Sequence, residues 1–328
     1  MPVRKSPLTI GFLLSVCAWF VSSLPAYGAA AQTAVLWRAP ADIASRNLYY
    51  GPGGRKDVPR GTFTFVKEDL QGSNPKFVVR DQYGHKWKVK LGIEARPETV
   101  ASRLVWAVGY SANEDYFVSN LHVQGMPAHL HRGRNLIGPD GWVRNVRLKR
   151  EDEKKAGHWR WRHDPFTGTR ELNGLKVVMA LINNWDLKDV NNAIYQDGDA
   201  QIYMVSDLGA SFGAAGRAWP RQKAKGNLEV YERSRFIRKV TPLDVDFEAP
   251  ARPSLIYVVN PKEYFSRLRL ESIGRNIPRE DARWIGDWLA RLSPKQILDA
   301  FRAADYSPRE AAAFAQVIER RIAVLTDL

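Results

Sequence analysis

The sequence predicts an α+β fold in which an antiparallel sheet and one helix come first and a mainly helical region follows. Three observations predict it. Apolar and polar residues alternate between Gly61 and Leu91, as in the strands of an antiparallel sheet. Apolar residues recur at helical spacing after Pro97 and again from Glu171 to Asn183. Two Ser-Pro pairs near the C-terminus are typical of helix starts.

The first 28 residues are predicted to form a secretory signal peptide. Arg4 and Lys5 give a positive start, residues 8–21 are apolar, and Ala26-Tyr27-Gly28 places small residues at the cleavage site. An uncleaved anchor is the alternative, although the apolar run is short for a spanning helix. We therefore expect an extracytoplasmic protein, periplasmic or secreted, that associates with a membrane only if the leader stays attached.

Chain length, cysteine content and net charge limit the size of the fold and the kinds of partner. The chain has 328 residues, 45% of them hydrophobic, which is enough for one large domain or two lobes. Its one cysteine, Cys17, lies in the predicted leader, so no disulfide or thiol metal site is expected after cleavage. The net charge of +14 favours acidic partners such as nucleotides. Zinc-finger spacing, RNP-like aromatic motifs and repeats are missing from the sequence, so no nucleic-acid partner is expected.

The first half supplies the sheet and its helix. After an N-terminal extension over residues 29–60, strands are predicted at Thr62–Val66, Lys76–Arg80 and Lys86–Leu91. A helix follows from Glu98 to Tyr110, opened by Pro97. Strand composition returns at Asp115–Val118 and Gly141–Val146. The basic, aromatic stretch His158–His163 is predicted to be a packed loop with solvated arginines; stacking on a base or contact with a membrane surface is the alternative.

A helix from Glu171 to Asn183 leads into the most informative stretch, Asn184-Trp185-Asp186-Leu187-Lys188-Asp189-Val190-Asn191. The Asp-Gly signal at residues 197–198 predicts a hairpin whose second strand ends before Ser206-Asp207-Leu208-Gly209. A tight hairpin would bring Asp207 beside Asn191. Phosphoryl transfer needs this set of groups: a carboxylate for the nucleophile, a cation for the moving phosphoryl, and an amide and a carboxylate for Mg²⁺.

The pattern D-L-K-x-x-N followed by D-x-G resembles the protein-kinase-like superfamily. The resemblance covers roughly residues 61–215 and is nearer to the atypical branches (HipA-like, phosphoinositide-kinase-like and secretory-pathway kinases), because the G-x-G-x-x-G lid and the A-P-E motif are missing from the sequence. It implies a two-lobed fold. Residues 61–135 would form an N-lobe of antiparallel sheet plus one helix, and residues 136–328 a mainly helical C-lobe.

The resemblance also implies roles for individual residues. Asp186 would be the catalytic base and Lys188 would neutralise the moving phosphoryl, while Asn191 and Asp207 would bind the metal. Lys90 and Glu98 would form the phosphate-positioning ion pair, with Lys88 and Glu94 as their respective alternatives. Gly72 and Ser73 lie in the connection between the first two strands and would approach the phosphates. Taken without the resemblance, this connection is better explained as a plain hairpin loop.

The function implied is that of an exported phosphotransferase that uses ATP with Mg²⁺ or Mn²⁺ and a hydroxyl acceptor. Two alternatives keep the same fold: a pseudokinase that binds or scaffolds an acidic partner, and a nucleotidyl transferase that binds ATP reversed in the same cleft. The sequence does not identify the acceptor, which could be a protein, a lipid, a sugar or another small molecule.

Overall fold

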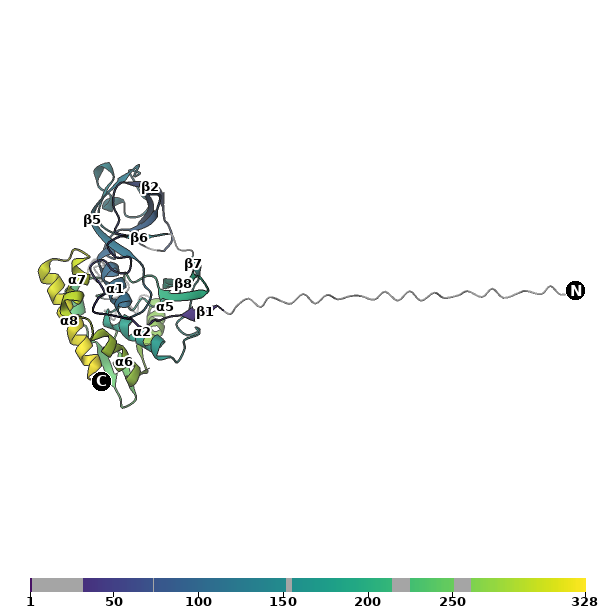
Figure 1. The fold of residues 1–328 in the computed structure, drawn as a ribbon, viewed down its shortest axis with the longest axis vertical. Helices are drawn as coiled ribbons and strands as arrows, with labels where there is room; N and C mark the ends of the chain where they lie inside the picture. The colour runs from purple at the N-terminus through teal and green to yellow at the C-terminus, as the bar shows by residue number, and fades with distance from the viewer. Residues whose placement is uncertain (2–31, 73, 152–154, 214–224, 251–260) are drawn as a thin grey trace. The chain divides into compact units, whose positions relative to one another are not determined.

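The computed structural model describes residues 1, 32–72, 74–151, 155–213, 225–250 and 261–328. Its helices and sheets confirm the α+β class, and residues 32–328 form one compact unit (Figure 1). The body of the predicted signal peptide, with Cys17, lies outside the described residues, and so does Ser73. No helix among the described residues has both the length and the apolar character that crossing a membrane requires.

The first half of the chain builds a closed barrel in the strand order β2-β3-β4-β6-β5. These strands are β2 (Phe63–Glu68), β3 (Lys76–Asp81), β4 (Lys86–Lys90), β5 (Asp115–Gln124) and β6 (Trp142–Arg150). Neighbours pair antiparallel except β2 and β5, whose parallel pairing at Phe63–Val123 closes the barrel. Alternate side chains from the strands fill its interior, among them Phe77, Val89 and Leu148. The predicted antiparallel sheet is therefore present, and one parallel contact converts it to a barrel.

The last barrel strand lies later in the sequence than the expected end of the first lobe. Residues 136–328 were expected in the C-terminal lobe, but β6 pairs with both β4 and β5. Val143, Val146 and Leu148 point into the barrel core, which fixes the register of β6. The barrel thus extends to Arg150.

Helix α1 (Ala95–Ala107) packs between the barrel and the larger core. It begins three residues before the predicted start, so Pro97 occupies its third position. Proline is tolerated there because the first N–H groups of a helix have no intrahelical acceptor. Val100, Leu104 and Val105 lie on one face and are buried in the larger core.

A second sheet carries the hairpin that the sequence predicts. Its order is β1-β9-β8-β7, formed by β1 (Thr33–Val35), β7 (Lys155–Gly157), β8 (Asn192–Asp197) and β9 (Ala200–Val205). The turn between β8 and β9 uses Gly198 at φ 56°, a left-handed conformation that glycine adopts without steric cost. Asn192 pairs with Val205, so the residues that flank the hairpin meet at its open end.

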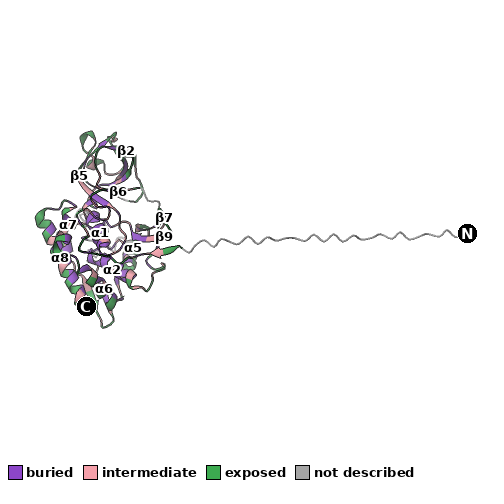
Figure 2. Ribbon diagram, in the orientation of Figure 1, coloured by how far each residue is buried: buried purple, intermediate pink, exposed green. Residues whose placement is uncertain are grey.

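The remaining helices enclose the larger core. They are α2 (Arg170–Leu181), α3 (Leu228–Arg233), α5 (Pro261–Glu271), α6 (Arg279–Leu289), α7 (Pro294–Arg302) and α8 (Pro308–Thr326). Short 3₁₀ turns lie at η1 (Arg134–Leu136), η2 (Pro139–Gly141), η3 (Asp189–Asn191) and η5 (Ser272–Gly274). The barrel strands lie at one end of the unit and α6 and α8 at the other (Figure 1), and buried residues line the inner faces of these helices (Figure 2).

The helix starts at Ser293 and Ser307 are confirmed, since both form complete capping boxes, with Gln296 and Glu310. A small sheet of β10 (Ile237–Val240), β11 (Asp244–Phe247) and β12 (Ile277–Pro278) was not anticipated. Its strands are two to four residues long, too short to give a periodic signal.

Candidate active site

A pocket of about 580 Å³ joins the barrel, the start of α1 and the open end of the β8–β9 hairpin. Among the described residues, eight cationic and four acidic side chains line it. The cationic ones are Lys76, Lys88, Lys90, Arg147, Lys149, Lys155, Lys188 and Lys225, and the acidic ones are Glu94, Glu98, Asp186 and Asp207. This excess of positive charge suits a polyanionic ligand.

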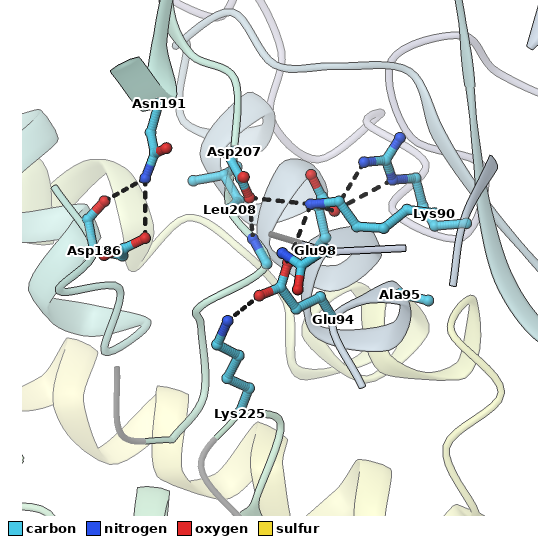
Figure 3. A network of polar contacts seen from close by, with 12 residues as sticks. Lys90, Glu94, Ala95, Glu98, Asp186, Asn191, Asp207, Leu208 and Lys225 are labelled. Carbon is cyan, nitrogen blue, oxygen red and sulfur yellow. Dashed lines mark hydrogen bonds and ion pairs between the residues drawn. The ribbon is translucent and has the colours of Figure 1, made fainter. Parts of the chain in front are cut away.

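Lys90 lies at the centre of the polar contacts in this pocket. Its Nζ lies 2.7 Å from a Glu98 carboxylate oxygen and 3.1 Å from Asp207 Oδ1, with Glu94 3.3 Å away. Figure 3 shows Lys90 reaching Asp207 on one side and Glu98 on the other. Burial alone would lower the pKa of Lys90, but Asp207 and Glu98 raise it above its ordinary value. The lysine therefore stays charged and links strand β4, helix α1 and the end of the hairpin.

Arg147 supports this network from the neighbouring strand. It is the cross-strand partner of Lys90, and its guanidinium contacts Glu98 at 2.9 Å and Asp115 at 3.3 Å. Burial by itself would lower the pKa of Arg147, but Glu98 and Asp115 raise it. Glu98 is 1% exposed and contacts both cations through the same oxygen. It therefore screens two buried like charges from one another.

Asp207 is the acid that faces the open part of the pocket. Its side chain is 40% exposed, and its Oδ1 accepts from Lys90 and from the Gly209 N–H at 3.2 Å. Burial alone would raise the pKa of Asp207, but Lys90 and the Gly209 N–H lower it to about 2. The carboxylate is therefore ionised at every pH at which the protein would ordinarily be studied.

This depressed pKa predicts a pH window for stability. The pKa of Asp207 lies below the value of about 3.9 for an unfolded chain, so its stabilising contribution is present above that pH and is lost as the pH falls toward 2. We expect the difference in unfolding free energy between the wild type and Asp207→Asn to be constant above about pH 5 and to shrink between about pH 4 and 2. Urea titrations across this range measure it, and a difference that grows in acid would contradict the assignment.

The second group of polar side chains lies on the loop after α2. The Asn191 amide donates to the Asp186 backbone oxygen at 2.6 Å and to its carboxylate at 3.2 Å. Lys188 contacts the same carboxylate at 2.8 Å, and Arg267 of α5 reaches it at 3.3 Å. Asp186 is thus held from three directions, with its carboxylate still partly exposed to the pocket.

The hairpin brings these two groups together. The Asn191 carbonyl accepts from the N–H groups of Ser206 and Asp207, at 2.8 and 3.2 Å. Asp207 then contacts Lys90 across the pocket. Figure 3 shows the Asp186–Asn191 contacts and the Asp207–Lys90 contact as two groups, and the backbone hydrogen bonds of Asn191 join them. The Asn191 and Asp207 side chains therefore line the same pocket.

A divalent cation would find oxygen ligands here, from the Asp207 carboxylate and the Asn191 side-chain oxygen. Mg²⁺ typically takes one or two carboxylates and completes its shell with phosphate oxygens and water. No group of three or more His, Cys, Asp or Glu side chains among the described residues is arranged to hold a metal by itself. The donor set fits an ion that a bound polyphosphate helps to hold, rather than a permanent structural metal.

The predicted phosphate-binding connection between β2 and β3 also borders the pocket. Gly72 and Asn74 line it, and Gly72 has φ 66°. The Asn74 amide contacts Glu94, while Arg132 contacts the Gly72 carbonyl. Ser73, the other predicted residue, lies outside the described part of the chain.

The structure separates the two candidate lysines on β4. Lys88 also borders the pocket, but its ammonium pairs with Asp69 at 3.0 Å and Glu151 at 2.9 Å. Lys90 instead contacts Glu98 and Asp207. Of the two acids, Glu98 lies nearer to Lys90, while Glu94 divides its carboxylate between Lys90 and Lys225. The geometry therefore favours Lys90 with Glu98.

Three site residues were missed. Arg147 is one of several arginines in a strand, and local sequence does not distinguish it from Arg144 or Arg150. Lys225 belongs to a basic run whose other cations, Arg217, Arg221 and Lys223, lie outside the described residues. Arg267 is in a helix that was not predicted. Each acts through a contact between distant parts of the chain, so no spacing signal existed.

Comparisons with known proteins do not assign a function to this chain. No family model matches the chain, and no curated protein matches it. Among solved structures it is similar to the crystal structure of CtkA, a proinflammatory kinase from Helicobacter pylori. The TM-score is 0.44 and the identity 11%, over 82% of this chain and 98% of that one. A likeness of this degree is too small to assign an activity.

Proposed function

We propose that this chain is a kinase-like phosphotransferase that moves the γ-phosphoryl group of ATP to a hydroxyl acceptor with the help of Mg²⁺ or Mn²⁺. The observation that carries the proposal is that Lys90 contacts Glu98 and Asp207 in the pocket that also contains Asp186 and Asn191. The barrel with α1 would act as the nucleotide-binding lobe and the rest of the unit as the lobe that carries the acceptor-side residues.

Nucleotide binding would use the positive side of the pocket. Lys90, held in place by Glu98, is positioned to contact the phosphates, and the backbone around Gly72 can approach them without a side chain in the way. Asp207 and Asn191 would hold the metal, which would supply neutralising charge to the phosphate oxygens.

The transfer step is assigned to the loop after α2. The Asp186 carboxylate accepts the proton of the acceptor hydroxyl as the oxygen of that hydroxyl bonds to the γ-phosphorus. The bond between this phosphorus and the oxygen that bridges it to the β-phosphorus breaks, and ADP leaves with the electron pair. Lys188, 2.8 Å from Asp186, is placed to offset the charge on the moving group.

The leader predicted at residues 1–28 extends this proposal to an exported enzyme. Acceptors would then be met during export or outside the cytoplasm.

The experiment is transfer from labelled ATP, with Mg²⁺ or Mn²⁺, to the protein itself and to candidate acceptors, followed by intact-mass analysis. A gain equal to a phosphoryl group supports the proposal. A gain equal to an adenylyl group would replace it with nucleotidyl transfer. Metal-dependent nucleotide binding without any turnover would replace it with a pseudokinase.

The two lysines of β4 provide a matched pair of variants. We expect Lys90→Met to lower transfer by about a hundredfold, because it removes the cation that faces the phosphates. Lys88→Met should lower transfer by less than about threefold, since the charge of its ammonium is already neutralised by Asp69 and Glu151. Initial rates at saturating ATP measure both. Equal losses would remove the assignment of Lys90.

A further inference from the structure

A second pocket lies directly beside the loop that carries Asp186. It has a volume of about 690 Å³ and is bordered by Leu187 and Lys188, the two residues that follow Asp186. His158, Lys188 and Val190 border both this pocket and the one described above. A molecule seated here would lie against the proposed catalytic loop. We call it the arginine pocket because Arg160, Arg162 and Arg269 line it.

None of these three arginines forms an ion pair with an acid in the part of the chain that the structure describes. All three are exposed, and no carboxylate of the described residues lies within ion-pair distance of any of their guanidinium groups. Arg162 is oriented by a hydrogen bond to the Ser272 hydroxyl. Lys188 adds a fourth cation at the edge nearest Asp186. Lys188 is paired with Asp186, so it is the three arginines whose charge the described residues leave without an ion-pair partner.

The floor of the arginine pocket is apolar. Trp161, Leu187, Leu270 and Ile273 line it, and all four are buried. Asp189, the one acid among the described residues that border it, accepts a hydrogen bond from the Trp161 backbone N–H at 3.3 Å. An apolar floor below a cationic rim fits a small molecule with a carbon skeleton and a charged end, and the volume is in the range of small-molecule sites, about 300–1,000 Å³.

We propose that the arginine pocket binds the acceptor, and that this acceptor is a small hydroxyl compound bearing a phosphomonoester. The assignment of the bound molecule as acceptor rests on the proposed function; the binding site itself does not. Guanidinium groups bind phosphate and carboxylate through paired hydrogen bonds. A phosphomonoester carries a charge of about −1.5 to −2, so it matches several cations better than a single carboxylate does.

The position of Asp186 completes the geometry. Lys188 contacts the Asp186 carboxylate and also borders the arginine pocket. Helix α5 supplies Arg269 to the pocket and Arg267 to Asp186, at 3.3 Å. The anionic end of the acceptor would be held by the arginines while its hydroxyl points across Lys188 toward Asp186.

The test is direct binding of glycerol phosphate to the full chain, measured by titration calorimetry. Neutral glycerol and a serine peptide flanked by glutamates serve as comparison probes. We expect Arg160→Gln and Arg269→Gln each to weaken glycerol phosphate binding by about tenfold, as the loss of a charge-assisted hydrogen bond implies. Arg309→Gln, in the first turn of α8, is the matched control, since Arg309 is exposed and lies outside both pockets.

Each outcome decides one point. Equal affinities for Arg269→Gln and Arg309→Gln, or no binding by the wild type, would overturn the arginine pocket. Tighter binding of the acidic peptide, lost in the same variants, would overturn the phosphomonoester class. Transfer from ATP is measured on the same proteins. If phosphoryl transfer occurs but is unchanged by the Arg160 and Arg269 substitutions, the proposed function stands and this inference fails. If glycerol phosphate binds but no phosphoryl group is transferred, the binding site stands and the proposed function fails.

Discussion

Replacing Asp207 by Asn is expected to lower phosphoryl transfer by roughly a thousandfold. The substitution keeps the shape of the side chain but removes the negative charge that faces the open pocket. Two functions would be lost together. The metal would lose its carboxylate ligand, and Lys90 would lose the partner that lies 3.1 Å away across the pocket.

Asp197→Asn is the matched control for this prediction. Asp197 lies on the same hairpin and is exposed, but it is outside the pocket. Initial rates with Mn²⁺ and Mg²⁺, at several metal concentrations, separate a loss of metal affinity from a loss of transfer. If Asp207→Asn transferred phosphate at the rate of Asp197→Asn, Asp207 would not be the metal ligand and the proposed function would lose its main support.

The loop after α2 and the β8–β9 hairpin were predictable because their geometry is local. An Asp-Gly turn sets the hairpin, and the two strands are equal in length, so Asp207 returns beside Asn191 by construction. The capping boxes were predictable for the same reason, since Ser and the residue three positions later are neighbours in any helix start. These local rules predict where the residues of the motif lie, but they do not predict which other residues surround them.

The choice between Lys88 and Lys90 shows what local rules omit. Both side chains lie on one face of β4, and alternation treats them alike. The structure separates them by their neighbours: Lys88 finds Asp69 and Glu151, while Lys90 is buried against α1 and the end of the hairpin. Those contacts depend on where α1 and β6 come to lie, and no spacing along β4 encodes that.

Barrel closure was missed for a related reason. The parallel contact between β2 and β5 joins segments about 60 residues apart, and the sequence pattern of each strand is the same whether the sheet is open or closed. The pairing of β6 with β4, which is also between distant segments, places Arg147 opposite Lys90. The proximity of these two buried cations is therefore visible only in the tertiary structure.

Because Lys90 and Arg147 lie close together on either side of Glu98, substitution of Glu98 is expected to have a large effect on stability. Its carboxylate contacts Lys90 at 2.7 Å and Arg147 at 2.9 Å, and all three side chains are at most 5% exposed. Glu98→Gln keeps the shape but leaves two buried cations side by side. We expect the free energy of unfolding to fall by about 3 kcal/mol, because removing one partner of a buried ion pair leaves an uncompensated charge. Asp207, Glu94 and Asp115 remain to offset part of the loss.

Urea unfolding at neutral pH measures this change, with Glu280→Gln as its matched control. Glu280 also lies in the first turn of a helix, α6, but it is exposed, so its substitution should alter the unfolding free energy by less than about 0.5 kcal/mol. A further comparison separates charge from packing: Lys90→Met should lessen the effect of Glu98→Gln, because one of the two repelling cations is then gone. If the effects of the two substitutions simply added, Glu98 would contribute through packing, and the network around Lys90 would not depend on its charge.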